Sequence, residues 1–180
     1  MNTTQTERTY AIDPAHSYAE FVVRHLMIAK VRGRFSAMSG AITLADDGNI
    51  PASVEASIDT TSISTNDAQR DGHLQSPDFF DSQTFPNMTF TSTQIVASRD
   101  GFELHGDLTI HGTTRPVVLA TTFEGRATDP WGNERVGFEA HGTINRTDFG
   151  LTFNQTLETG GVLVGEEVKI EIAVEAIAQK

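Results

Sequence analysis

The feature that most constrains this chain is an alternation of apolar and polar residues that recurs along most of its length. In the clearest case Phe102, Leu104, Leu108 and Ile110 share one parity, and polar residues occupy the other. Period-two alternation places apolar side chains on one face of an extended strand. The sequence therefore predicts about eight strands, at residues 18–25, 35–44, 53–59, 88–96, 102–111, 117–123, 135–144 and 164–176.

Short turn sequences separate these segments. They are Asp46–Asn49, Arg99–Gly101, His111–Thr114, Asp129–Asn133 and Gly160–Gly161. Connections of this length join antiparallel neighbours, because a parallel pair needs a crossover of about a dozen residues or more. Closing such a meander into a barrel removes its two exposed edges. We therefore expect an all-β fold, and an antiparallel eight-stranded barrel ahead of a two-sheet sandwich.

One long segment, Ser62–Pro86, interrupts the alternation. Asn66 with Gln69 three residues later resembles a capping box, and Ser76–Pro77 places a cap before a proline. The segment is predicted to hold one or two short helices. A connection of this length in a meander is often functional, as a lid or a plug. Its large apolar residues are Leu74, Phe79, Phe80 and Phe85.

The inward faces mix large and small residues, which leaves two interpretations of the interior. Gly106 stands between Leu104 and Leu108, and Ala140 and Gly142 follow Phe138. Small residues either let a barrel bend or leave volume, and a barrel of about eight strands holds at most one small ligand. Alternatively, phenylalanine rings from neighbouring strands fill the space and the barrel is solid. A solid barrel would suit a stress or interaction protein.

Composition excludes several classes of partner. The net charge is −11, from 24 acidic and 13 basic residues, so the average field repels nucleic acid. The chain has no cysteine for disulfides or thiolate sites. No apolar run approaches the roughly 20 residues of a membrane-spanning helix, so no stable membrane insertion is expected. The polar opening Met1–Arg8 lacks a signal-like apolar segment, and we expect a cytoplasmic location.

A set of motifs in fixed order resembles the YceI-like family. They are Ile12–Ser17 (IDPAHS), Gly33–Phe35 (GRF), Ser62–Thr65 (SIST), Arg70–Leu74 (RDGHL), Asp78–Asp81 (DFFD), Thr89–Ser92 (TFTS), Gly106–Gly112 (GDLTIHG) and Asn145–Gly150 (NRTDFG). The resemblance implies a single lipocalin-like barrel domain over residues 10–178, after a flexible N-terminus at 1–9. It also implies that the pore binds an isoprenoid lipid, such as an isoprenoid quinone or a prenyl diphosphate. Fatty acids or other amphiphiles are the alternative, and a homodimer is a candidate assembly.

The alternation and the resemblance together predict the residues that hold such a ligand. Its tail is expected to contact a set of apolar side chains, and its head group a smaller polar set. The predicted pore lining is Phe21, Val23, Phe35, Ile63, Leu74, Phe79, Phe80, Phe90, Leu104, Leu108, Phe138 and Phe149, and the head-group candidates are Arg70, His73 and Arg146. Equally, Asp71 and Asp148 could pair with the two arginines, which would make both clusters structural.

Catalysis and metal binding are weaker interpretations. No nucleophile elbow, zinc-protease motif or glycine-rich phosphate loop is present. A small hydrolase using His73, Asp71 and Arg146 on a lipid-like substrate remains the alternative from another class. His105 and His111 lie about 20 Å apart on one strand, too far to share an ion. We expect no enzyme activity, no metal and no required cofactor beyond a bound lipid.

Overall fold

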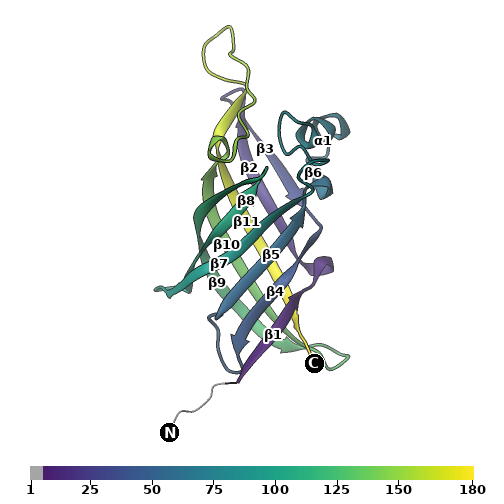
Figure 1. The fold of residues 1–180 in the computed structure, drawn as a ribbon, viewed down its shortest axis with the longest axis vertical. Coiled ribbons are helices and arrows are strands. Elements are labelled where there is room, and N and C mark those ends of the chain that lie inside the picture. The colour runs from purple at the N-terminus through teal and green to yellow at the C-terminus, as the bar shows by residue number, and fades with distance from the viewer. Residues whose placement is uncertain (1–5) are drawn as a thin grey trace.

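The protein is an elongated antiparallel β-barrel, seen from the side in Figure 1. The computed structural model describes residues 6–180. Its strands are β1 (Glu7–Ile12), β2 (Tyr18–His25), β3 (Ala29–Phe35), β4 (Met38–Ala45), β5 (Ser53–Asp59), β6 (Ile63–Ser64), β7 (Asn87–Ala97), β8 (Phe102–Ile110), β9 (Thr113–Thr128), β10 (Glu134–Asn145) and β11 (Val164–Ala178). The helical elements are α1 (Ala68–Gln75) and the 3₁₀ turns η1 (Pro14–His16), η2 (Thr60–Ser62) and η3 (Arg146–Phe149).

Eight strands close the ring, in the order β1-β4-β5-β7-β8-β9-β10-β11 and back to β1. The first strand is bent: β1 pairs with the end of β11 (Ile12↔Ala176), and β2 pairs with its earlier part (Tyr18↔Ala173). η1 makes the bend, and Asp13 caps it by accepting a hydrogen bond from the amide of Ala15. The expected closed eight-stranded antiparallel barrel is therefore confirmed.

Several local predictions differ from the structure. β1 and most of β3 were not predicted. β1 has only six residues, and β3 alternates Lys30 and Arg32 with Val31 and a glycine, which weakens the apolar signal. The sequence predicted a flexible N-terminus at residues 1–9. Residues 1–5 lie outside the described part of the chain, and residues 7–9 belong to β1.

The interrupting segment holds one α-helix, and its cap differs from the predicted one. Asp67 is the N-cap of α1, and its carboxylate accepts the amide hydrogen of Arg70 at 3.0 Å. Asn66 instead adopts a positive φ of 61° before the cap. After α1, Ser76–Pro77 begins a series of turns and no second helix. Within residues 6–180 no helix is both long and apolar enough to cross a bilayer.

The two ends of the barrel differ. The start of β1, the C-terminus and the β4–β5 and β9–β10 turns lie at the lower end in Figure 1, and the β7–β8 turn projects at the left. The β2–β3 turn, α1 and the long β10–β11 connection lie at the upper end. We call these the terminal end and the α1 end. Tyr10, Leu44 and Val136 are almost completely buried in β1, β4 and β10, and they form the floor of the interior toward the terminal end.

Candidate functional site: an apolar cavity inside the barrel

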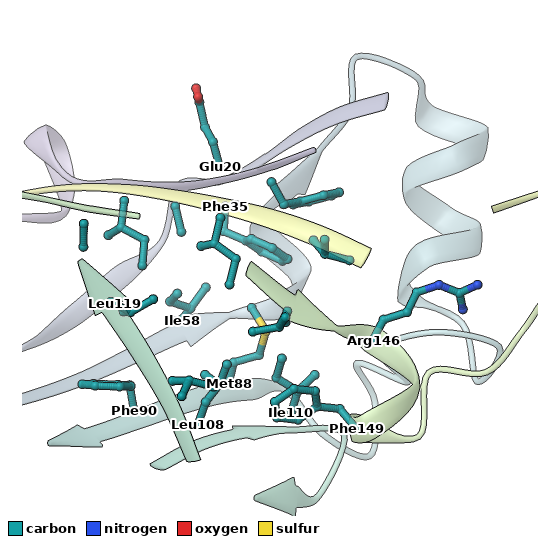
Figure 2. Close-up of a pocket in the computed structure, with 18 of the residues that line it drawn as sticks. Glu20, Phe35, Ile58, Met88, Phe90, Leu108, Ile110, Leu119, Arg146 and Phe149 are labelled. Carbon is teal, nitrogen blue, oxygen red and sulfur yellow. The ribbon is translucent and has the colours of Figure 1, made fainter. Parts of the chain in front are cut away.

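The interior of the barrel contains a cavity of about 340 Å³. This volume lies within the range of about 300–1,000 Å³ that is typical of small-molecule pockets. Every strand of the closed ring contributes lining side chains. Figure 2 shows Phe35, Ile58, Met88 and Leu108 among the side chains that surround it. The interior is therefore not the solid core that the sequence left open.

Most of the residues predicted to line a pore do line this cavity. The eleven are Phe21, Val23, Phe35, Leu74, Phe79, Phe80, Phe90, Leu104, Leu108, Phe138 and Phe149. Ile63 is the exception: it is buried in the core but does not reach the cavity wall. Ile63 belongs to the two-residue strand β6, which pairs only with β3, at the far end of the sheet from the closed ring. Phe21 on β2, Leu104 on β8 and Phe138 on β10 therefore face the interior.

Sequence reasoning missed other parts of the wall. Met38, Met88, Ile110 and Ile172 line the cavity, and so do Arg24 and His25 at the α1 end. Ile110 and Ile172 had the correct inward parity in patterns already recognised, so parity alone could have found them. Arg24 and His25 end β2, where alternation alone does not show that a strand reaches the rim.

The inward glycines do not create the cavity, because large side chains already occupy the space above them. A Cβ on Gly33 would lie 2.1 Å from Cζ of Phe21, and one on Gly106 would lie 2.3 Å from Cζ of Phe90. Gly142 faces Leu119 in the same way, at 2.6 Å from Cδ2. These glycines let large side chains lie flat against the wall. The cavity is the volume that remains between the rings.

The floor ends in a partly buried polar cluster. Tyr10 donates a hydrogen bond to Oε1 of Glu134, and Arg126 donates to the same oxygen at 2.6 Å. Arg126 also donates to the carbonyl oxygens of Asp46 and Gly48, both at 2.9 Å. Burial and the hydrogen bond to Glu134 raise the pKa of Tyr10, and the same bond lowers the pKa of Glu134. These groups satisfy one another and join four segments at this end.

At the α1 end, aromatic rings cover the cavity. Phe80 meets Phe35 edge-on at a centroid distance of 5.5 Å, and Phe79 packs against Phe153 at 5.3 Å. His73 lies edge-on to Phe79 and Phe153, at 5.1 and 4.9 Å. The segment after α1 therefore contacts both β3 and the β10–β11 connection through aromatic rings. Phe79, Phe80 and Phe153 lie on segments without ladder pairing, whereas Phe35 belongs to the paired strand β3.

Of the three head-group candidates, Arg146 has most of its donors occupied within the protein. It is buried, and its guanidinium donates to the carbonyl oxygens of Gly165, Leu151, Phe153 and Val164 at 2.6 to 3.2 Å. Burial lowers its pKa. An arginine has five N–H donors, so this geometry leaves at most one for a ligand. Arg146 therefore fixes the start of the β10–β11 connection, and Asp148 is not its partner.

Arg70 and His73 are more available. Arg70 is exposed and donates from Nε and Nη2 to the hydroxyl and carbonyl oxygens of Thr65, both at 2.8 Å. Its Nη1 has no hydrogen-bond partner in the described part of the chain. Asp71 accepts from the amide and hydroxyl of Thr65 instead of pairing with Arg70. His73 contacts Asp78, with Nε2 and Oδ2 at 2.9 Å.

These positions do not assemble the catalytic constellation that the alternative required. Asp71 is used by Thr65, the guanidinium of Arg146 by backbone carbonyls, and His73 by Asp78. No serine or threonine hydroxyl contacts the His73 ring in the described residues. The geometry therefore favours binding over hydrolysis.

A second ionic cluster lies on the outer face of the barrel, and sequence reasoning missed it. One ligand atom each from Asp13, His16 and Glu175 lie within 4.8 Å of one another. However, Arg135 donates to Asp13 at 2.8 Å, to Glu175 at 2.7 Å and to Asp129 at 2.9 Å. The guanidinium thus already supplies a cation to these carboxylates. It holds the pKa of Asp13 at about 2.

The fold and the cavity define a class: a lipocalin-like antiparallel barrel that encloses an apolar binding space. The YceI-like domain family model matches residues 10–176. Protein YceI of Escherichia coli O17:K52:H18 is 37% identical over 173 residues, covering 95% of this chain and 87% of that protein. The chain therefore belongs to the YceI-like family.

Solved structures agree with this assignment. The crystal structure of a Campylobacter jejuni YceI protein matches with a TM-score of 0.74 and 30% identity, over 87% of this chain and 90% of the other. A domain from Saccharophagus degradans, described as polyisoprenoid binding, matches with a TM-score of 0.67 and 17% identity, over 94% and 98%. The latter likeness concerns the fold alone.

Proposed function

We propose that this protein binds a long-chain isoprenoid lipid, and stores or transports it without catalysis. The observation that carries the proposal is an apolar cavity with charged side chains toward one end only. Glu20 borders the cavity, but its carboxylate points away from it and pairs with Arg34 (Figure 2). Membership of the YceI-like family and the described ligand class of the S. degradans domain support an isoprenoid.

Hydrocarbon burial supplies enough free energy for this role. Each buried methylene contributes about 0.8 kcal/mol, so a ten-carbon tail gains about 8 kcal/mol before the cost of ordering it. The lining offers almost no hydrogen-bonding groups along its length; Thr121 is an exception, and its hydroxyl donates to the carbonyl of Leu119. Selection along the tail therefore depends on shape and length.

The first experiment identifies the ligand and tests the cavity. Native mass spectrometry of protein purified from its own host should show a co-purified isoprenoid lipid. After delipidation, isoprenoid alcohols and fatty acids of equal carbon number compete for a fluorescent lipid probe. Tighter binding of fatty acids would make the ligand an acyl amphiphile, and no binding of either class would refute the proposal.

A matched pair of variants places the ligand. Ala140 is buried and lines the cavity, whereas Ala120 on the adjacent strand is exposed. Ala140→Phe should weaken binding by about tenfold or more, because the ring displaces at least two methylenes' worth of contact. Ala120→Phe should leave affinity unchanged. Equal effects of both substitutions would show that the tail does not occupy this cavity.

We assign the head group to the α1 end, beside Arg70 and His73. Arg70→Gln should weaken binding of a prenyl diphosphate more than that of the matching prenyl alcohol, since a charge-assisted hydrogen bond is lost only for the diphosphate. Equal losses for the two ligands would show that Arg70 acts only on the fold, through Thr65. No specific observation favours a second function.

A further inference from the structure

The β2–β3 turn at the α1 end exposes three consecutive large apolar side chains. Leu26, Met27 and Ile28 are 37%, 53% and 84% exposed. Leu26 and Met27 also adopt positive φ angles of 54° and 63°. Such turn positions favour glycine, asparagine or aspartate, because a side chain is strained there. Met27 lies beside Gly161 of the β10–β11 connection. Neither turn geometry nor burial explains the side chain of Ile28, so a contact outside the chain is the remaining physical reason for it.

The strands beside the tip carry cations without acidic neighbours in sequence. Residues 21–45 contain no aspartate or glutamate, in a chain with a net charge of −11. They include Arg24, Lys30, Arg32 and Arg34. Arg34 pairs with Glu20, but no carboxylate in residues 6–180 forms an ion pair with Lys30 or Arg32. These two cations therefore present unneutralised charge.

Protection of a sheet edge accounts for only part of this pattern. β6 pairs with β3 only at Arg34 and Phe35, so residues 29–33 form an open edge. Charged side chains on an edge prevent pairing with other strands. That role explains Lys30 and Arg32, but it gives no reason for the exposed apolar tip. Cations flanking exposed apolar side chains are instead typical of segments that lie at a membrane surface.

The tip also adjoins the cavity. Val23, Arg24 and Val31 beside it line the cavity wall, and the amide of Leu26 donates to the carbonyl of Leu163 at 2.9 Å. The opposite, terminal end is closed by the floor and its polar cluster. A surface that received the tip would therefore meet the barrel at the end where the exposed residues Arg70 and His73 border the cavity.

We propose that the β2–β3 turn docks the protein on a bilayer that contains anionic lipids. Leu26, Met27 and Ile28 enter the headgroup region, and Lys30 and Arg32 contact lipid phosphates. The net charge repels such a surface in other orientations, so only this end approaches. The β10–β11 connection, which contains Glu158, extends beyond this turn in Figure 1, so it has to lie beside the docked tip. Docking goes beyond lipid binding, because it specifies where a ligand passes between bilayer and cavity.

The test uses sedimentation of the full chain with sucrose-loaded vesicles of phosphatidylcholine, with and without phosphatidylglycerol. We expect binding to the anionic vesicles. Ile28→Asp should abolish it, and Lys30→Gln with Arg32→Gln should reduce it by about 30-fold, as expected for two cations near an anionic surface. The matched controls lie away from the tip: Trp131→Asp, at a position 80% exposed, and Arg99→Gln with Lys180→Gln should change nothing.

The single tryptophan gives an independent readout. Trp131 lies in the β9–β10 turn, far from the tip, and its emission should not shift when vesicles are added. Ile28→Trp in a Trp131→Phe background should shift to the blue. A blue shift of Trp131, no vesicle binding, or equal losses in Ile28→Asp and Trp131→Asp would each overturn docking. Loss of self-association instead of vesicle binding in Ile28→Asp, measured by size-exclusion chromatography, would also overturn it.

Failure of docking and failure of lipid binding are separable. Delipidated protein that binds hydrocarbon probe but no vesicles refutes the docking proposal and leaves the proposed function intact. Protein that docks but binds no probe refutes the proposed function alone.

Discussion

Gly33 provides the sharpest test of how the cavity wall is packed. It faces the interior in β3, directly beneath the ring of Phe21 on β2. In Gly33→Ala the new Cβ would lie 2.1 Å from Cζ of Phe21. Carbon atoms pack best at about 3.5–4.0 Å, so the ring has to move by about 1.5–2 Å. The wall blocks movement outward, and the ring therefore moves into the cavity.

Overpacking determines how much Gly33→Ala lowers the free energy of unfolding. Forcing a side chain out of its packed position costs about 1–3 kcal/mol, and replacing glycine by alanine returns about 0.4–1 kcal/mol through the unfolded state. We expect Gly33→Ala to lower the free energy of unfolding by about 1–2 kcal/mol in urea titrations. It should also weaken binding of a hydrocarbon probe, because the displaced ring occupies part of the cavity.

A double-mutant cycle shows whether the ring is responsible. Phe21→Leu removes the atoms that the new Cβ would meet, so Gly33→Ala should cost much less in that background and the coupling should exceed about 1 kcal/mol. Gly137→Ala is the matched control, since its Cβ would meet its nearest neighbour at an ordinary 3.6 Å. Additivity of the two substitutions within about 0.5 kcal/mol would refute this account of the wall.

Three further predictions concern the rest of the barrel. Gly72→Ala in α1, where a Cβ meets nothing within 4 Å, should raise the free energy of unfolding by about 1 kcal/mol; a decrease would mean that α1 is not helical at this residue. Tyr10→Phe should lower that free energy by about 1.5–3 kcal/mol through loss of the bond to Glu134, and a change below about 0.5 would contradict it. The pKa of Asp13 is lowered from 3.8 to about 2, so its contribution is complete above pH 4 and disappears as the pH falls toward 2. Carboxyl NMR titration should return this pKa toward 3.8 in Arg135→Met, and an unchanged value would exclude Arg135 as the cause.

The sequence predicted those strands of the barrel that have one clearly apolar face and one clearly polar face. β8 is the best example, because Phe102, Leu104 and Ile110 are buried and the intervening residues are more exposed. β3 could not be predicted in this way. Its inward positions include Gly33, so apolar and polar residues do not alternate clearly along it, and the strand forms because it pairs with β2. Long-range pairing is a property of the closed ring, which local alternation does not contain.

The sequence indicated an apolar site inside the barrel, but it did not indicate the volume of the cavity. Alternation gives the direction of each side chain, and this placed most of the wall. Whether the interior is hollow depends on how rings such as Phe21 and Phe90 lie over Gly33 and Gly106, which is a matter of a few ångströms between strands distant in sequence. The roles of the arginines were also beyond local reasoning. A nearby aspartate suggested a salt bridge, whereas the folded chain offers Arg146 a set of backbone carbonyls.

Arg126 and Arg146, at opposite ends of the barrel, show why a ligand should bind in one orientation. Arg126 at the floor shares its charge with the carboxylate of Glu134, so an anionic head group there would meet an already neutralised cation and a competing carboxylate. Arg146 at the α1 end is held by neutral carbonyls, so its positive charge has no bonded counter-ion and adds to that of Arg70. An anionic head group is therefore favoured at the α1 end even without direct contact to Arg146. A prenyl diphosphate with a spin label on the head group should broaden NMR signals of residues in α1 and leave those of Tyr10 and Glu134 sharp, and the reverse pattern would refute this orientation.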